Sequence, residues 1–132
     1  MVDFSEWGDE TVATSKRDPK DSGHTFEDYF KRAASPMLVL RLLSEKPMYV
    51  YQMAQELEKR SNGVYTLSLL YPVIYRLVKM GYVSEGQKEV SSDNRVRQYY
   101  CITDNGRAYL KEIYQKYILL DHAVRDIIAE LD

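Results

Sequence analysis

One predicted helix carries side chains that suit contact with the grooves and phosphates of a nucleic acid. Thr66 or Ser68 can cap a helix that runs to Met80, and Gly81 ends it. One side of this helix is apolar, with Leu70, Ile74, Leu77 and Val78. The opposite side is small, aromatic or cationic, with Ser68, Pro72, Tyr75, Arg76 and Lys79. Such groups fit base edges and phosphates in a major groove, although a solvated face of an ordinary amphipathic helix has a similar composition.

The residues after this helix predict a β-hairpin that carries cations. Tyr82–Val90 and Val96–Ile102 are β-prone, and Ser91-Ser92-Asp93-Asn94 between them is a turn signal. Three basic residues lie on or near the tip, namely Lys88, Arg95 and Arg97. Alternation along the second strand places Val96, Gln98, Tyr100 and Ile102 on one face and Arg95, Arg97, Tyr99 and Cys101 on the other.

We expect one face of this hairpin to pack on the domain and the other to offer cations to a phosphate backbone. Glu85, Glu89 and Asp93 dilute the positive charge. A solvated hairpin of mixed charge therefore remains as an alternative.

The last predicted helix follows Thr103-Asp104-Asn105-Gly106 and continues nearly to Asp132. Apolar residues recur along it at alternating spacings of three and four, at Leu110, Ile113, Tyr117, Leu120, Val124, Ile127 and Leu131. This spacing is typical of the seam between two helices and predicts a homodimer. The stripe can also fold back on its own domain, and Tyr114, Ile118, Leu119 and Ile128 widen the apolar surface, so we expect one flank to pack internally.

No pattern of residues points to catalysis or to a bound metal. His24 and His122 have no Ser, Cys or carboxylate constellation near them in the sequence, and there is no Gly-rich phosphate loop. A single cysteine, Cys101, excludes an intramolecular disulfide and a cysteine zinc cluster. We therefore expect no enzyme, no cofactor and no metal. With no signal peptide and no long apolar run, we expect a cytoplasmic chain without a membrane partner.

The small net charge of −2 hides a basic centre between acidic ends. Residues 1–30 carry eight acidic and three basic residues. Residues 31–101 carry six acidic and eleven basic residues, and residues 102–132 carry six acidic and four basic residues. We interpret residues 1–24 as a flexible acidic tail, which phosphates would repel. Residues 25–103 then form the DNA-binding domain and residues 104–132 the dimerisation helix.

The remaining segments predict helices that support this layout. Thr25 and Asp28 resemble a helix cap, Pro36 is expected to interrupt and begin a second helix that runs to Ser44, and Tyr51–Arg60 forms a third that Ser61-Asn62-Gly63 ends. Val64-Tyr65 is assigned a very short strand. The predicted fold is mainly α with a minor β part, a winged helix-turn-helix with a long C-terminal helix.

The chain resembles the PadR family of bacterial transcriptional regulators from about Ser35 to Asp132. The motifs that carry the resemblance are Pro47-Met48-Tyr49-Val50-Tyr51, Ser61-Asn62-Gly63, Leu70-Tyr71-Pro72, Arg76-Leu77, Gly81-Tyr82-Val83, Arg97-Gln98-Tyr99-Tyr100 and Thr103-Asp104-Asn105-Gly106-Arg107. Some positions depart from the family pattern. The stretch between Gly63 and Leu70 is shorter than usual, Val50 replaces a common glycine, and Gln98 replaces a common base. Pro72 should cost one helical hydrogen bond.

The resemblance implies a homodimeric repressor that binds double-stranded DNA at a pseudo-palindromic operator. The third helix, including Tyr71, would contact the bases, and the hairpins would contact the flanking backbone. In multidrug-binding relatives, an aromatic residue of the last helix stacks on planar aromatic ligands. Tyr117 stands at that position here, and plain packing at the dimer seam explains it equally well. The alternative function is a winged-helix module that binds proteins without specific DNA binding.

Overall fold

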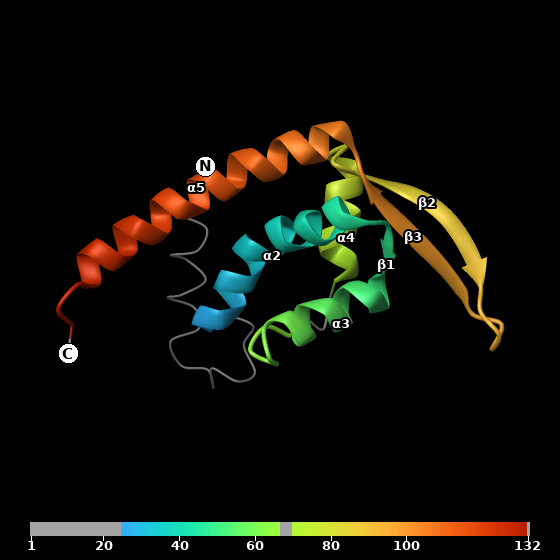
Figure 1. The fold of residues 1–132 in the computed structure, drawn as a ribbon, viewed down its shortest axis with the longest axis horizontal. Helices are drawn as coiled ribbons and strands as arrows, with labels where there is room; N and C mark the ends of the chain where they lie inside the picture. Colours follow the sequence, from blue (N-terminus) through green and yellow to red (C-terminus); the bar gives the residue numbers. More distant parts are fainter. Residues whose placement is uncertain (1–24, 67–69, 132) are drawn as a thin grey trace. The chain divides into compact units, whose positions relative to one another are not determined.

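The computed structural model describes residues 25–66 and 70–131 (Figure 1). The elements are, in order, α2 (Phe26–Glu45), β1 (Met48–Tyr49), α3 (Val50–Arg60), α4 (Tyr71–Lys79), β2 (Val83–Val90), β3 (Val96–Ile102) and α5 (Asp104–Ile128). The chain divides into two units with the boundary between Ala34 and Ser35, inside α2. The mainly helical fold with a small antiparallel sheet and a long last helix confirms the predicted fold class. The predicted tail, residues 1–24, lies outside the described residues.

Helix α2 is continuous, so the predicted break at Pro36 is wrong. Ser35, expected as a cap for a second helix, is fully buried, and its hydroxyl lies 2.5 Å from the hydroxyl of Tyr65. Ser35 therefore lies within one helix and not at the start of another. The start of α2 is as expected, because the Thr25 hydroxyl accepts from the Asp28 N–H at 3.2 Å and the Asp28 carboxylate accepts from the Thr25 N–H at 3.2 Å.

The hydrophobic core lies where α2, α3 and α4 meet the base of the sheet. Its buried side chains are Val39, Leu40, Leu42, Leu43, Met48, Met53, Leu57, Leu70, Ile74, Leu77, Val83 and Tyr100. These positions recur at helical spacing in α3 and α4, which explains why each of these helices packs by one side and exposes the other.

Three strands form the sheet in the order β1-β3-β2. Met48 pairs with Tyr100, and Tyr49 pairs with Tyr99. The strand predicted at Val64-Tyr65 is wrong, because the backbone N–H of Tyr65 donates to the Ser61 hydroxyl at 2.8 Å instead of to a strand. A two-residue strand is too short to show alternation, which is why the sequence pattern does not predict β1.

Backbone turns end α3 and α4 at the predicted residues. Asn62 and Gly63 have φ angles of 54° and 81°, and the Gly63 N–H donates to the Glu58 carbonyl at 2.8 Å. After α4, Gly81 has a φ of 83°. These turns place α3 and α4 as consecutive helices of a helix-turn-helix.

Helix α5 begins at a cap that also joins it to the end of α4. The Thr103 hydroxyl accepts from the Gly106 N–H at 3.0 Å and donates to the Gly81 carbonyl at 2.7 Å. Gly106 is buried, and a Cβ atom there would lie 2.1 Å from the Tyr82 carbonyl oxygen. The close approach of the two backbones therefore requires glycine at this position.

Candidate nucleic-acid interface

Helix α4 presents the predicted polar side outward. Tyr71 and Tyr75 are 53% and 58% exposed, and Arg76 and Lys79 are exposed as well. The opposite side is buried through Ile74 and Leu77. This two-sided division is as the sequence predicts. Ser68, which was expected on the same outer face, lies outside the described residues.

The start of α4 differs from the prediction. The helix begins at Tyr71 with Leu70 as its N-cap, and Leu70 makes no side-chain capping bond. Thr66 lies outside the helix and does not cap it. Pro72 therefore occupies the first turn, where a backbone N–H has no acceptor within the helix. The expected loss of a hydrogen bond at Pro72 does not occur.

Three tyrosines are found on α4 and on β3. The ring centroids of Tyr71 and Tyr75 are 5.9 Å apart, and the Tyr100 ring is buried. Burial raises the pKa of the Tyr100 hydroxyl, and the neighbouring Tyr75, Glu85 and Tyr71 raise it further. The face of β3 that carries Tyr100 therefore lies beside the exposed tyrosines of α4.

The hairpin projects beyond the helices of its unit, as Figure 1 shows. β3 has the predicted bounds, and β2 begins one residue later than predicted, at Val83. The register of the two strands shifts between Glu85 and Lys88. Lys88 pairs with Gln98, which shares a face of β3 with Tyr100. The Gln98 amide donates to the Gly86 carbonyl at 2.9 Å, so it secures the irregular part of β2. Lys88 accordingly lies on the α4 side of the hairpin.

Arg95 and Arg97 have different surroundings. Arg95 is in the turn, its side chain is 82% exposed, and its guanidinium lies 3.4 Å from the Asp93 carboxylate. Arg97 is half-buried, with its guanidinium carbon 4.9 Å from the centroid of the Tyr49 ring. Arg97 is on the face of β3 opposite Lys88 and Tyr100. The expectation that one face packs on the domain holds at Tyr100, but the other face is itself occupied at Arg97.

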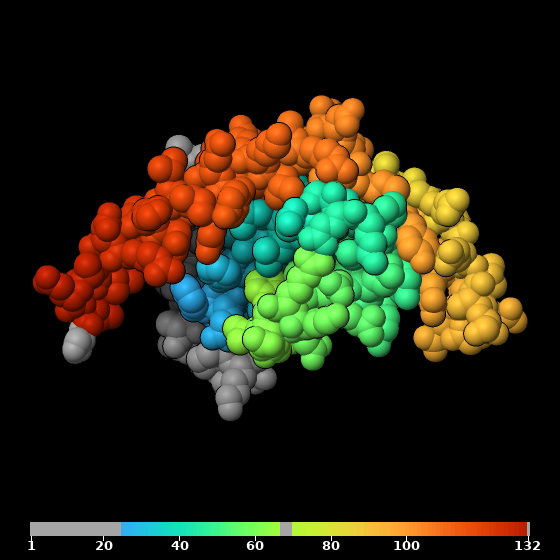
Figure 2. Space-filling view, in the orientation of Figure 1, coloured from blue at the N-terminus to red at the C-terminus, as the bar shows by residue number. Residues whose placement is uncertain are grey.

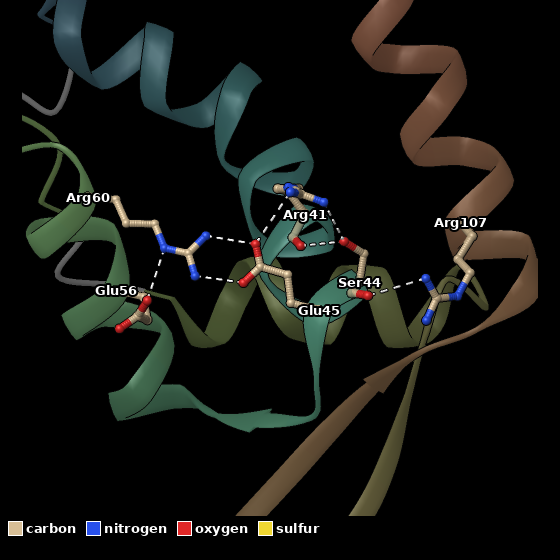
Figure 3. Close-up of polar contacts among 6 residues, drawn as sticks. All are labelled: Arg41, Ser44, Glu45, Glu56, Arg60 and Arg107. Atoms are coloured by element: carbon tan, nitrogen blue, oxygen red, sulfur yellow. Dashed lines mark hydrogen bonds and ion pairs between the residues drawn. The ribbon is translucent and has the colours of Figure 1, made fainter.

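Ion pairs hold α3 to the end of α2 (Figure 3). The Arg60 guanidinium donates to both Glu45 oxygens, at 2.8 and 2.6 Å, and to Glu56 at 2.9 Å. The hydrogen bond from Arg60 is the main reason that the pKa of Glu45 is lowered, and Glu45 raises the pKa of Arg60 in turn. Sequence spacing could have suggested Glu56 with Arg60, one helical turn apart, but not Glu45, which is 15 positions away.

The apolar stripe of α5 has two parts. Leu110 and Ile113 pack against the chain's own core, and Tyr117 is half-buried. Further along, Leu120, Val124 and Ile127 are exposed, as is Leu131 beyond the end of the helix. Leu119 and Ile128 add to this exposed surface. Within the described chain, the first part of the predicted seam is used internally and the second part faces outward.

A groove of about 710 Å³ lies between α2 and α5. Figure 2 shows the teal part of α2 against the orange part of α5, and the Arg107 guanidinium donates to the Ser44 carbonyl at 3.4 Å. The lining residues are Met37, Leu38, Arg41, Ser44, Arg107, Leu110, Lys111 and Tyr114. Tyr114 lines this groove, and its ring lies 6.5 Å from that of Tyr117, with planes at 15°. The predicted role of Tyr117 in a cavity between two subunits stays a prediction.

Within residues 25–66 and 70–131, no helix has the length and apolar content that a membrane span requires. In the same part of the chain, no three His, Cys, Asp or Glu side chains gather as metal ligands would.

Part of the chain matches a known protein family and a bacterial relative. Residues 39–112 match the model of the transcriptional regulator PadR-like family. An uncharacterised protein of Lysinibacillus sphaericus is 37% identical over 82 residues, which are 61% of this chain and 74% of that protein.

Several solved structures share the fold. A transcriptional regulator from Clostridium thermocellum has a TM-score of 0.69 and 24% identity, with 75% of this chain and 97% of that chain covered. A PadR family regulator from Eggerthella lenta has a TM-score of 0.66 and 21% identity, with 96% of each chain covered. A PadR-like regulator from Bacillus cereus has a TM-score of 0.63 and 23% identity, with 76% and 97% covered.

Proposed function

Because this chain belongs to the PadR-like family of transcriptional regulators, which bind DNA and are not enzymes, we propose that it is a repressor that binds a pseudo-palindromic operator as a homodimer. The observation that carries the proposal is the outer side of α4, where Tyr71, Tyr75, Arg76 and Lys79 are exposed together. A dimer bound across a promoter excludes other proteins from the same DNA. The proposed repressor would act in the cytoplasm.

The proposed contacts divide by chemistry. Tyr71, Pro72, Tyr75 and Arg76 lie on the outer side of α4 and would face base edges. Ser68, which lies outside the described residues, is proposed as a further contact. Lys79 at the end of α4, together with Lys88 and Arg95 of the hairpin, would pair with phosphates. Each phosphate contact steepens the dependence of log K on log salt by about 0.9.

The proposed dimer forms through the stripe of α5. Leu120, Val124 and Ile127 are exposed along one stripe of the helix, which supports a second copy as their cover. Leu110, Ile113, Tyr117 and Leu131 would flank this contact. Two copies of α4 would then meet half-sites about one turn of duplex apart, roughly 34 Å.

The same proposal includes release by a small planar aromatic effector. The groove between α2 and α5 is lined by apolar side chains, among them Leu110 and Tyr114, and by three cations, Arg41, Arg107 and Lys111. The three cations favour an effector with an anionic substituent. Thermal-shift measurements with a planar aromatic carboxylate and with the matching amine would test it. A larger stabilisation by the carboxylate is expected, and equal responses would count against the site.

Gel retardation tests the main proposal. Purified chain is titrated onto DNA from its own upstream region and onto a scrambled duplex, across a salt series. Specific retardation that weakens steeply with salt is expected. Absent or sequence-independent retardation at low salt would instead favour a winged-helix module that binds proteins.

A further inference from the structure

Four side chains meet on the face of the hairpin that points away from Tyr100. The Arg97 guanidinium lies over the Tyr49 ring at 4.9 Å. The Tyr49 and Tyr99 rings meet edge to face, with centroids 5.3 Å apart and planes at 79°. The Tyr99 hydroxyl donates to the Glu89 carboxylate at 3.1 Å. We call Tyr49, Glu89, Arg97 and Tyr99 the Tyr49 cluster.

The Tyr49 cluster joins the hairpin to the first helix of the helix-turn-helix. Tyr49 is both the last residue of β1 and the N-cap of α3, and its backbone N–H donates to the Gln52 side chain at 3.2 Å. Glu89 belongs to β2, and Arg97 and Tyr99 belong to β3. A displacement of the hairpin relative to α3 would therefore separate these side chains.

Arg97 is poorly placed to neutralise a phosphate. It is half-buried on an aromatic face, and it pairs in the sheet register with the oppositely charged Glu89. Arg95, only two residues away, has a side chain that is 82% exposed. The two arginines therefore differ in what they contact.

We propose that Arg97 is a positioning residue, which fixes the hairpin against α3 through the Tyr49 ring instead of contacting phosphate itself. For DNA binding, the inference rests on the proposed function. A planar guanidinium can lie flat on a ring, whereas the ammonium of lysine is a compact point charge. A positive charge alone would then not be enough at residue 97 to hold the hairpin against α3.

Operator binding separates the two roles. Arg95→Gln should lower the salt slope by about 0.9 for each phosphate that Arg95 neutralises in the wild type. Arg97→Gln and Arg97→Lys should both weaken binding by roughly two- to thirtyfold with the wild-type slope. Tyr49→Phe, which keeps the ring, should bind normally. In a chain that already carries Arg97→Gln, the further change Tyr49→Leu should weaken binding little more. Normal binding by Arg97→Lys, or a reduced slope for Arg97→Gln, would overturn the proposal.

A second measurement needs no DNA and so separates this inference from the proposed function. Spin labels at Ser92→Cys and Lys59→Cys, in a Cys101→Ser background diluted with unlabelled chain, report the distance from the hairpin turn to the end of α3. This distance distribution should broaden in Arg97→Gln and Arg97→Lys and stay unchanged in Arg95→Gln. An unchanged distribution in Arg97→Gln would overturn the inference even if the wild type binds its operator as proposed. A broadened one supports it even if the wild type binds no operator.

Discussion

The Tyr82 ring stacks on the Tyr109 ring, with centroids 4.3 Å apart and planes at 6°. Tyr82 follows the turn that ends α4, and Tyr109 lies in the second turn of α5. Together with the Thr103 bond to the Gly81 carbonyl, this stack joins the proposed DNA-contacting helix to the proposed dimer helix. The start of α5 and the end of α4 therefore contact each other through both a ring stack and a hydrogen bond.

Gly106→Ala should destabilise the fold by about 1–3 kcal/mol or more, because the new methyl group would clash with the Tyr82 backbone. Denaturant unfolding would measure the loss. Asn105→Ala, an exposed neighbour in the first turn of α5, is the control and should change the free energy of unfolding far less. Equal stability of the two variants would mean that the backbones separate without cost.

Arg76→Ala should weaken specific binding by about 1–3 kcal/mol and relax the base preference at one operator position. Binding to a panel of single-base operator variants would measure both effects. Lys116→Ala, which removes an exposed cation from α5, should leave the preference intact. A uniform loss over all sequences would show that Arg76 contacts only phosphate.

Leu120→Glu should yield monomers that no longer bind the operator, because a carboxylate replaces an apolar side chain at the proposed contact. Sedimentation gives the assembly state, and gel retardation gives the binding. Gln115→Glu adds the same charge at an exposed position off the stripe and should remain dimeric. A Leu120→Glu protein that stays dimeric would show that the seam lies elsewhere.

Glu45→Gln should flatten the acid dependence of stability. Arg60 lowers the pKa of Glu45 in the folded chain. The unfolded chain therefore binds this proton more readily, so the stabilisation is present above the ordinary pKa of 4.5 and is lost as the pH falls through the lowered value.

Melting temperatures between pH 7 and pH 3 would test this dependence. The wild type should lose more stability than Glu45→Gln over the acid part of that range. Glu58→Gln, an exposed carboxyl on α3, should follow the wild type. Parallel curves for the wild type and Glu45→Gln would contradict the assigned role of the pair.

Local signals predicted much of the fold. Several features depend on neighbours within a few positions. These are the caps at Thr25 and Thr103, the left-handed residues Gly63 and Gly81, and the hairpin. Such signals are complete within a short stretch of sequence, because the groups that satisfy each other are close along the chain.

Local sequence signals do not predict contacts between residues that are distant along the chain. The continuity of α2 at Pro36 accompanies a hydrogen bond between the hydroxyls of Ser35 and Tyr65, 30 positions apart. The pairing of β1 depends on Tyr99 and Tyr100, and the surroundings of Arg97 depend on Tyr49. Alternation placed Arg97 on the correct face of β3, but not against the ring that covers it.

The uncovered leucine, valine and isoleucine side chains toward the end of α5 have a quantitative consequence. If they are buried only when two chains meet, the paired form grows with the square of the chain concentration while it is scarce. Halving the amount of protein would then leave about a quarter of the operator-competent species. Operator occupancy by the proposed dimer would then fall more steeply than the amount of protein.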